Sequence, residues 1–272
     1  MLARMFIKLV HLTPGLQKSL WKWWYERLAD RGLEANWSFM NYGFTLSNGE
    51  MKRELKPEDE NDRLFIQLYD HAASQIPLDG KKVLEIGSGR GGGASFLTRY
   101  HHPSQMTGMD YSEKAVKLSS KLHKTVDDLL FVHGDAEALP FEDNSFEAVI
   151  NVESSHCYGN MSKFVKEVAR ILKLGGYFSW VDILGSKTIT DTENAFIIPE
   201  LSLIHESVIT PNVIKALDEI HDRKTEMINT HVPRWIQPAF RDFAGVKNSK
   251  IYNAFKDGTT IYLAKAFQKT VT

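Results

Sequence analysis

A run of glycines and three carboxylates carry the chemistry that this sequence suggests. Residues 83–93 read Val-Leu-Glu-Ile-Gly-Ser-Gly-Arg-Gly-Gly-Gly and pass from an apolar stretch into glycines. Gly87, Gly89 and Gly91 have no Cβ, so the backbone can turn sharply and a ligand can lie against the main chain. A helix that starts behind such a turn offers free N–H groups to a carboxylate. Glu85 adds a negative charge that suits the ammonium group of a zwitterion and repels a pyrophosphate.

Two further carboxylates fit the remaining parts of one nucleotide. Asp110 ends the next apolar stretch, where a carboxylate can hydrogen-bond both ribose hydroxyls. Gly134 precedes Asp135, which can accept a hydrogen bond from an adenine amino group, while the Ala136 N–H donates to the ring. Each feature alone is ambiguous, because Asp110 can cap a helix, Asp135 can belong to a turn, and the glycine spacing also fits a dinucleotide site. Their order along the chain favours a single ligand made of an amino acid, a ribose and an adenine.

Side chains that could transfer a proton follow the fourth apolar stretch. Residues 151–158 read Asn-Val-Glu-Ser-Ser-His-Cys-Tyr. We predict His156 as the general base, since imidazole titrates near neutral pH. Glu153 is predicted to orient His156 or to form a wall of the reaction pocket. The sequence leaves open that His156 only packs against the ligand or caps a helix. No metal-ligand spacing is present, so we expect no metal.

Strands and helices alternate between residues 62 and 184, and this alternation positions the carboxylates. Apolar stretches of strand length separate segments with helical spacing, a pattern typical of right-handed βαβ crossovers and a mostly parallel sheet. The carboxyl ends of parallel strands share one edge, so the predicted residues meet there in a Rossmann-like α/β core. The predicted strands are Lys82–Ile86, Met106–Asp110, Leu129–His133, Ala148–Val152 and Tyr177–Ile183; the predicted helices are Leu64–Gln75, Ala94–Tyr100, Glu113–His123 and Met161–Leu172.

An N-terminal extension precedes this core. Residues 1–61 are predicted as a helical lid, with a tryptophan-rich helix at Leu16–Arg31 and the segment Asn41–Phe44 folding over the ligand. Packing of that helix on the core is the favoured interpretation. The alternative is peripheral contact with a membrane surface, because basic residues lie beside tryptophan and leucine.

Two regions after the core are predicted to complete the molecule. Residues 185–239 break the alternation and are predicted as a helical cap over the acceptor, with a helix at Asn212–Asn229. Residues 240–272 are predicted as a C-terminal β-hairpin, formed by Lys250–Phe255 and Thr259–Phe267 around an Asp-Gly turn. The hairpin would bring the sheet to seven strands.

Bulk composition narrows the class of protein. The chain has 272 residues with 33 basic and 34 acidic side chains, so no strong field favours nucleic acid. A single cysteine, Cys157, cannot form an intrachain disulfide and suits a reducing cytoplasm. No apolar run approaches the roughly 20 residues that span a bilayer. Met1–Val10 is apolar but short and lacks a small-residue cleavage site, so we predict no signal peptide. We expect a cytoplasmic protein whose oligomeric state the sequence does not reveal.

Taken together, the ordered motifs resemble the class I S-adenosylmethionine-dependent methyltransferases over about residues 62–184. Residues 172–176, Leu-Lys-Leu-Gly-Gly, add to the likeness, although Leu174 stands where that family often has proline. The resemblance implies S-adenosylmethionine as cofactor and S-adenosylhomocysteine as product. The predicted cofactor contacts are Glu85, Gly87, Ser88, Gly89, Gly91, Asp110, Tyr111, Asp135, Ala136, Asn151 and Tyr42.

Residues 91–99 and 151–158 narrow the likeness to one branch. They resemble the phthiotriolone/phenolphthiodiolone dimycocerosate methyltransferases, which O-methylate a lipid hydroxyl, and the likeness extends to Asn41 and Tyr42. It implies a hydrophobic small-molecule acceptor such as a lipid or polyketide. Sterol C-methyltransferases share a related segment around Glu153, so C-methylation stays open. Two further alternatives are a methyltransferase fold with other chemistry and a nicotinamide dehydrogenase, which the Glu85 charge disfavours.

Overall fold

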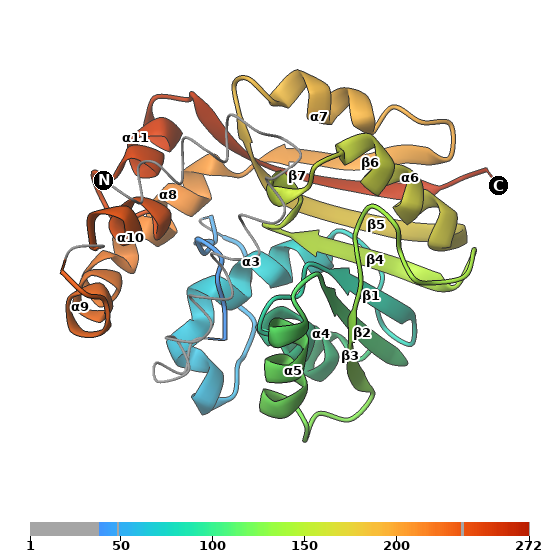
Figure 1. Ribbon diagram of the computed structural model, residues 1–272, viewed down its shortest axis with the longest axis horizontal. Coiled ribbons are helices and arrows are strands. Elements are labelled where there is room, and N and C mark those ends of the chain that lie inside the picture. The colour runs from blue at the N-terminus through green and yellow to red at the C-terminus, as the bar shows by residue number, and fades with distance from the viewer. Residues whose placement is uncertain (1–37, 48, 235–236, 272) are drawn as a thin grey trace.

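A seven-stranded sheet forms the centre of the computed structural model, which describes residues 38–47, 49–234 and 237–271. Its strand order is β3-β2-β1-β4-β5-β7-β6, with helices on both faces (Figure 1). The strands are β1 (Lys82–Ile86), β2 (Gln105–Asp110), β3 (Leu129–His133), β4 (Phe146–Val152), β5 (Leu172–Gly185), β6 (Leu201–Val208) and β7 (Thr260–Lys269). The helices are η2 (Pro57–Asp62), α3 (Arg63–Ser74), α4 (Gly92–His101), α5 (Glu113–Leu122), η3 (Ser155–Cys157), α6 (Met161–Ile171), α7 (Ile189–Ala195), α8 (Thr210–Glu219), α9 (His221–His231), α10 (Gln237–Phe243) and α11 (Lys250–Lys256).

The pairing of the strands confirms the predicted Rossmann-like, mostly parallel sheet. Strands β3, β2, β1, β4 and β5 are parallel to their neighbours, whereas β7 runs antiparallel to both β5 and β6. Ile86 at the end of β1 is level with Met109 of β2, and Asp110 is level with His133 of β3. The segments that follow β1, β2, β3 and β4 therefore gather at one edge of the sheet.

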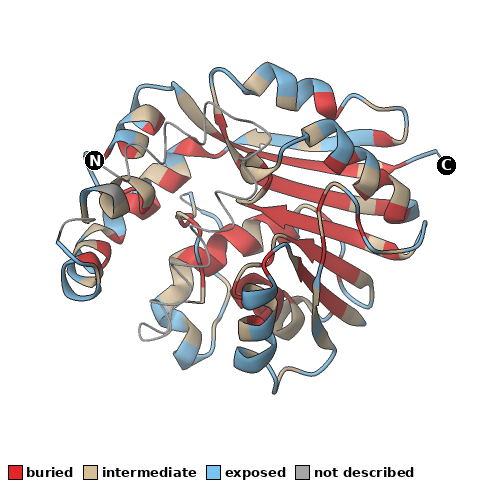
Figure 2. Cartoon of the chain, in the orientation of Figure 1, coloured by how far each residue is buried: buried red, intermediate tan, exposed pale blue. Residues whose placement is uncertain are grey.

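Apolar side chains bury both faces of the sheet. Figure 2 shows the buried residues concentrated along the strands, while the outer sides of the helices are exposed. On one face, Phe65, Leu68 and Ala72 of α3 recur at helical spacing and are buried. On the other face, Trp180 is fully buried and packs edge-on against Phe196. The two layers fix the strand ends rigidly.

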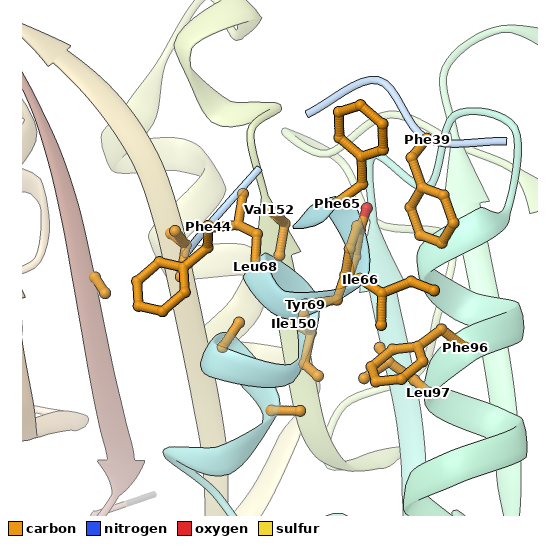
Figure 3. Close-up of a cluster of buried hydrophobic side chains, with 14 of the residues drawn as sticks. Phe39, Phe44, Phe65, Ile66, Leu68, Tyr69, Phe96, Leu97, Ile150 and Val152 are labelled. Carbon is orange, nitrogen blue, oxygen red and sulfur yellow. The ribbon is translucent and has the colours of Figure 1, made fainter. Parts of the chain in front are cut away.

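The segment before α3 joins the same core. Phe39 stacks on Phe65 with ring centroids 6.5 Å apart, and Phe44 is buried beside α3. Figure 3 shows Phe39 next to Phe65 and Phe44 next to Leu68. The Phe44 N–H donates to the carbonyl of Leu64 at 2.9 Å. The predicted lid segment is therefore anchored on α3, next to the carboxyl edge of the sheet.

The predicted C-terminal hairpin is wrong. Lys250–Lys256 forms the helix α11, in which the Ser249 hydroxyl accepts a hydrogen bond from the Tyr252 N–H at 3.3 Å. Tyr252 and Phe255, three residues apart, are the buried side chains, which is helical rather than alternating spacing. Besides β5, β7 pairs antiparallel with β6, a strand inside the region predicted as a helical cap. A short apolar run does not by itself distinguish a helix from a strand.

The predicted helix Asn212–Asn229 is two helices. The chain bends at Ile220, which separates α8 from α9. Together with α10 and α11 they gather at the side toward which β4 points (Figure 1). The tryptophan-rich helix at residues 16–31 lies outside the described residues. Within the part of the chain that the structure describes, no helix is long and apolar enough to cross a membrane.

Candidate active site

A cleft opens at the carboxyl edge of the sheet, where the segments after β1, β2, β3 and β4 meet. The predicted residues that line it are Gly87, Gly89, Asp110, Tyr111, Asp135, Ala136 and Glu153. Tyr158, from the segment that follows the fourth strand, and two residues that the sequence did not single out, Met40 and Ser154, also line the walls. The structure thus brings together side chains from four strand ends.

The glycine turn is shaped by contacts that a side chain would block. Gly87 has φ +78°, and a Cβ there would lie 2.3 Å from the Ser154 hydroxyl oxygen. Gly91 has φ +80° and starts α4, and its Cβ would lie 2.5 Å from the Phe131 ring. Left-handed backbone of this kind is open to glycine at little cost. Gly91 does not line the cleft, so its part is to start the helix behind the turn.

Asp110 ties the glycine turn to the end of β2. One carboxylate oxygen accepts from the Gly89 N–H at 2.8 Å, and the other accepts from the Ser112 N–H at 2.8 Å. Asp110 also lines the cleft, where a carboxylate can accept hydrogen bonds from ribose hydroxyls. Asp135 accepts from the Glu137 N–H at 2.9 Å and stands on the cleft wall beside Ala136. Both carboxylates lie where the sequence placed them.

Glu85 is fully buried on β1, beneath the turn rather than on the cleft wall. Its Oε1 accepts from the Tyr69 hydroxyl at 2.8 Å, and its Oε2 has no hydrogen-bond partner among the described residues. Burial raises the pKa of Glu85 to about 7, although the hydrogen bond from the Tyr69 hydroxyl acts to lower this pKa. The Ser88 hydroxyl is also buried without a partner in the described chain. Buried polar atoms are normally satisfied, so this pair of oxygens fits a ligand that brings donors, such as the ammonium end of S-adenosylmethionine.

Asn151 and Tyr42 were predicted to contact the cofactor, but neither lines the cleft. Asn151 is buried under the turn, where its amide donates to the carbonyl of Ile86 at 3.0 Å and to the Ser154 hydroxyl at 2.7 Å. The Tyr42 hydroxyl points away and donates to the carbonyl of Phe243 at 2.9 Å. Both residues position the walls of the cleft instead of forming them.

Glu153 lies on the cleft wall in an uncommon backbone conformation. Its φ is +46°, a left-handed value that is strained for a residue other than glycine. The Tyr42 N–H donates to Glu153 Oε1 at 2.7 Å and so joins the lid segment to the end of β4. Burial raises the pKa of Glu153 to about 7, although the hydrogen bond from the Tyr42 N–H and the charge of His156 act in the opposite direction. The carboxylate can therefore exchange a proton near neutral pH.

His156 lies beside the cleft and pairs with a carboxylate that the sequence analysis missed. Its Nδ1 lies 2.6 Å from Asp182 Oδ1, and its backbone N–H donates to Asp182 Oδ2 at 3.0 Å. Asp182 is fully buried on β5. The sequence signal that could have revealed it is a single acidic residue within an apolar strand. Burial disfavours the imidazolium, but the interactions with Cys157 and Asp182 prevail and raise the pKa of His156 well above its usual value. Asp182, and not Glu153, holds the ring.

Comparison with known proteins agrees with this geometry. A methyltransferase domain family matches residues 84–180. A phthiotriol/phenolphthiotriol dimycocerosates methyltransferase from Mycobacterium tuberculosis is 36% identical over 258 residues, which cover 94% of each chain. The chain belongs to this methyltransferase family. A fatty-acid O-methyltransferase from Mycolicibacterium smegmatis is 33% identical over 260 residues, which cover 96% of this methyltransferase and 92% of that relative.

Solved structures share the fold of this methyltransferase at low sequence identity. A geranyl diphosphate C-methyltransferase from Streptomyces coelicolor, in complex with S-adenosyl-L-homocysteine, has a TM-score of 0.67 at 15% identity, covering 94% of this chain and 99% of that one. The O-methyltransferase domain of StiE has a TM-score of 0.64 at 16% identity, covering 85% and 86%. The methyltransferase uses S-adenosylmethionine as its cofactor, as the sequence predicted.

Proposed function

We propose that this methyltransferase transfers the methyl group of S-adenosylmethionine to a hydroxyl of a hydrophobic, lipid-like acceptor. The names of the two relatives refer to dimycocerosates and to fatty acids, which are lipids. Apolar side chains such as Met40, Ile86 and Met109 supply much of the cleft wall, which suits such an acceptor. Aromatic rings of the lid segment lie directly beside it.

One observation supports O-methylation most strongly, namely a titratable carboxylate on the cleft wall. A hydroxyl must lose its proton to attack a methyl group, and a base with a pKa near the working pH does this best. Glu153 faces the cleft and has a pKa of about 7, so near neutrality a large fraction is ionised. His156 does not line the cleft and is held as an ion pair by Asp182. Glu153 therefore takes the role of base that the sequence analysis gave to His156.

The residues around Glu153 organise the reaction. When bound, S-adenosylmethionine supplies an electrophilic sulfonium methyl group. Glu85 and Ser88 would hold its amino-acid end, and Asp110 and Asp135 would hold its ribose and adenine. The Tyr42 N–H fixes one oxygen of Glu153, so the carboxylate is oriented before the acceptor arrives. The positive charge of His156 keeps the pKa of Glu153 lower than burial alone would set it.

The variant Glu153→Gln tests this proposal. It keeps the shape of the side chain but cannot take a proton, so we expect turnover to fall by roughly 10²- to 10⁴-fold. Cofactor affinity, measured by calorimetry, should change little. In the wild-type enzyme kcat/KM should rise with pH and level off above about 7, because Glu153 must be ionised. Glu142→Gln, on an exposed loop, is the matched control.

Turnover is measured by mass analysis of products made with isotopically labelled cofactor and candidate lipid alcohols. The proposal requires a new carbon–oxygen bond in the product. Unchanged turnover in Glu153→Gln would remove this residue as the base.

A second candidate is C-methylation of an alkene or enol. Methyl transfer to such a carbon develops positive charge, and the same Glu153 carboxylate would stabilise it without taking the first proton. A product with a new carbon–carbon bond would favour this reaction. The rate should still fall in Glu153→Gln, because the variant loses the carboxylate charge.

A further inference from the structure

A tyrosine hydroxyl lies on the wall of the cofactor cleft, in addition to Glu153. Tyr158 directly follows η3 and lines the cleft. Its hydroxyl lies against the glycine turn, since a Cβ on Gly87 would be 3.1 Å from the Tyr158 oxygen. The ring packs edge-on against Phe164 of α6, with ring centroids 4.9 Å apart. The side chain is therefore fixed on the core side, while its polar end meets the turn.

Asn151 and Ser154 hold the Tyr158 oxygen. The Asn151 amide donates to it at 3.1 Å, and the Ser154 hydroxyl oxygen lies 2.9 Å from it, where either group can be the donor. The Ser154 hydroxyl is also 3.2 Å from the carbonyl of Ile86, to which it can donate. When Ser154 donates to that carbonyl, Tyr158 donates to Ser154. The Tyr158 oxygen then accepts one bond, from Asn151, and keeps a second lone pair. A cation in the cleft favours this arrangement of the protons.

The Tyr158 oxygen stays neutral. Burial raises the pKa of the hydroxyl well above its ordinary value, although the hydrogen bonds with Ser154 and Asn151 act to lower it. A neutral oxygen attracts a positive charge through its dipole and lone pair, and it does so without a change of charge across the working pH range. Its contribution therefore differs from that of Glu153, which titrates at about pH 7.

The position of Gly87 indicates which part of the cofactor meets this oxygen. In S-adenosylmethionine the positive sulfur joins the amino-acid chain to the ribose. Gly87 lies between the groups assigned to these two parts. It directly precedes Ser88, and its N–H donates to the carbonyl of Met109, the neighbour of Asp110, at 2.8 Å. The Tyr158 oxygen beside Gly87 thus lies where the cationic centre belongs. After transfer the sulfur of S-adenosylhomocysteine is neutral.

We propose that Tyr158 recognises the sulfonium charge and gives the enzyme a preference for S-adenosylmethionine over S-adenosylhomocysteine. Its free lone pair accepts weak C–H···O hydrogen bonds from the carbon groups on the positive sulfur, and these bonds weaken once the sulfur is neutral. The spent product is then released more readily than the cofactor, which limits inhibition by the product. This inference concerns the cofactor alone and does not depend on which atom of the acceptor is methylated.

The test compares the affinities of three ligands by calorimetry, without acceptor and at about pH 8. Tyr158→Phe removes the oxygen and keeps the ring on Phe164. We expect its affinity for S-adenosylhomocysteine to change little, which also shows that the variant is folded, and its affinity for S-adenosylmethionine to fall about two- to fivefold. Sinefungin carries an amine in place of the methylated sulfur, so its affinity should fall about tenfold or more, because a charge-assisted N–H hydrogen bond is lost.

Three further variants separate the Tyr158 oxygen from other causes. Tyr177→Phe, on β5, is the matched control, since its hydroxyl accepts from Gln268 at 3.1 Å away from the cleft wall, and it should bind all three ligands as wild type does. Glu153→Gln removes the carboxylate on the same wall, and the effect of Tyr158→Phe should persist in that background. Ser154→Ala removes the acceptor of the Tyr158 proton, which can then turn into the cleft. The preference for S-adenosylmethionine should fall here too.

An equal change in the affinities for S-adenosylmethionine and S-adenosylhomocysteine in Tyr158→Phe would overturn the proposal. So would an effect that disappears in the Glu153→Gln background, because the preference would then come from the carboxylate. If Tyr158→Phe does not fold, Ser154→Ala decides the question, and an unchanged ratio of the two affinities in that variant would likewise overturn the proposal.

Discussion

Glu85→Gln should stabilise the protein that has no cofactor and weaken its binding of S-adenosylmethionine. In the folded chain the pKa of Glu85 is about 7, against 4.5 for the free side chain, because the carboxyl is buried. That difference of about 2.5 units corresponds to about 3 kcal/mol, at ~1.36 kcal/mol per unit. As pH rises, Glu85 ionises in the unfolded chain before it does so in the folded chain. The free energy of unfolding therefore falls by this amount as pH rises from about 4.5 through about 7. Below 4.5 both states are protonated and the cost disappears.

Glutamine removes the charge but still offers an oxygen to the Tyr69 hydroxyl. We therefore expect Glu85→Gln to raise the free energy of unfolding by up to about 3 kcal/mol at pH values above 7. Little change is expected near pH 4.5, which is the pKa of the free glutamate side chain. Affinity for the cofactor should fall by roughly 10- to 100-fold, since a charge-assisted hydrogen bond to the ammonium group is lost.

Urea denaturation followed by circular dichroism, without cofactor and over this pH range, measures the first effect, and calorimetry with S-adenosylhomocysteine measures the second. Glu142→Gln serves as the exposed control. A variant that is less stable than wild type above neutrality, or one whose stability difference does not depend on pH, would refute the reasoning from burial.

Two further predictions follow from the geometry around the cleft. Gly87→Ala places a Cβ 2.3 Å from the Ser154 hydroxyl oxygen at φ +78°, so it should cost about 1–3 kcal/mol in stability and lower cofactor affinity, both measurable by thermal unfolding with and without cofactor. Asp182→Asn should bring the pKa of His156 down toward or below its usual value, which an NMR titration of labelled histidine would detect, and should destabilise the fold by about 3–5 kcal/mol. Because the pKa of His156 is raised in the folded state, the loss in free energy of unfolding is full below about pH 6.5. It declines as pH rises through the pKa of His156 in the folded protein. An unshifted His156 would show that Asp182 does not set its charge.

The sequence by itself determined the strand ends and the types of side chain placed on them. The β1 strand, the glycine turn, Asp110 and Asp135 could be predicted because each depends on local properties, namely apolar strand length, the freedom of glycine at positive φ, and the shared edge of parallel strands. The five parallel strands of the core were found for the same reason. Even the error at Lys250–Phe255 was local, since Ser249 and the spacing of Tyr252 and Phe255 carried a helical signal.

Only the tertiary structure decided which side chains meet. Tyr42 and Glu153 are 111 residues apart, His156 and Asp182 are 26 apart, and Lys224 is buried by a lid segment far from it in the chain. These contacts change what each group does, moving the candidate base from His156 to Glu153 and lowering the pKa of a lysine to about 7. Periodicity and residue type report the backbone around a position, whereas burial and charge pairing depend on distant segments that only folding brings together.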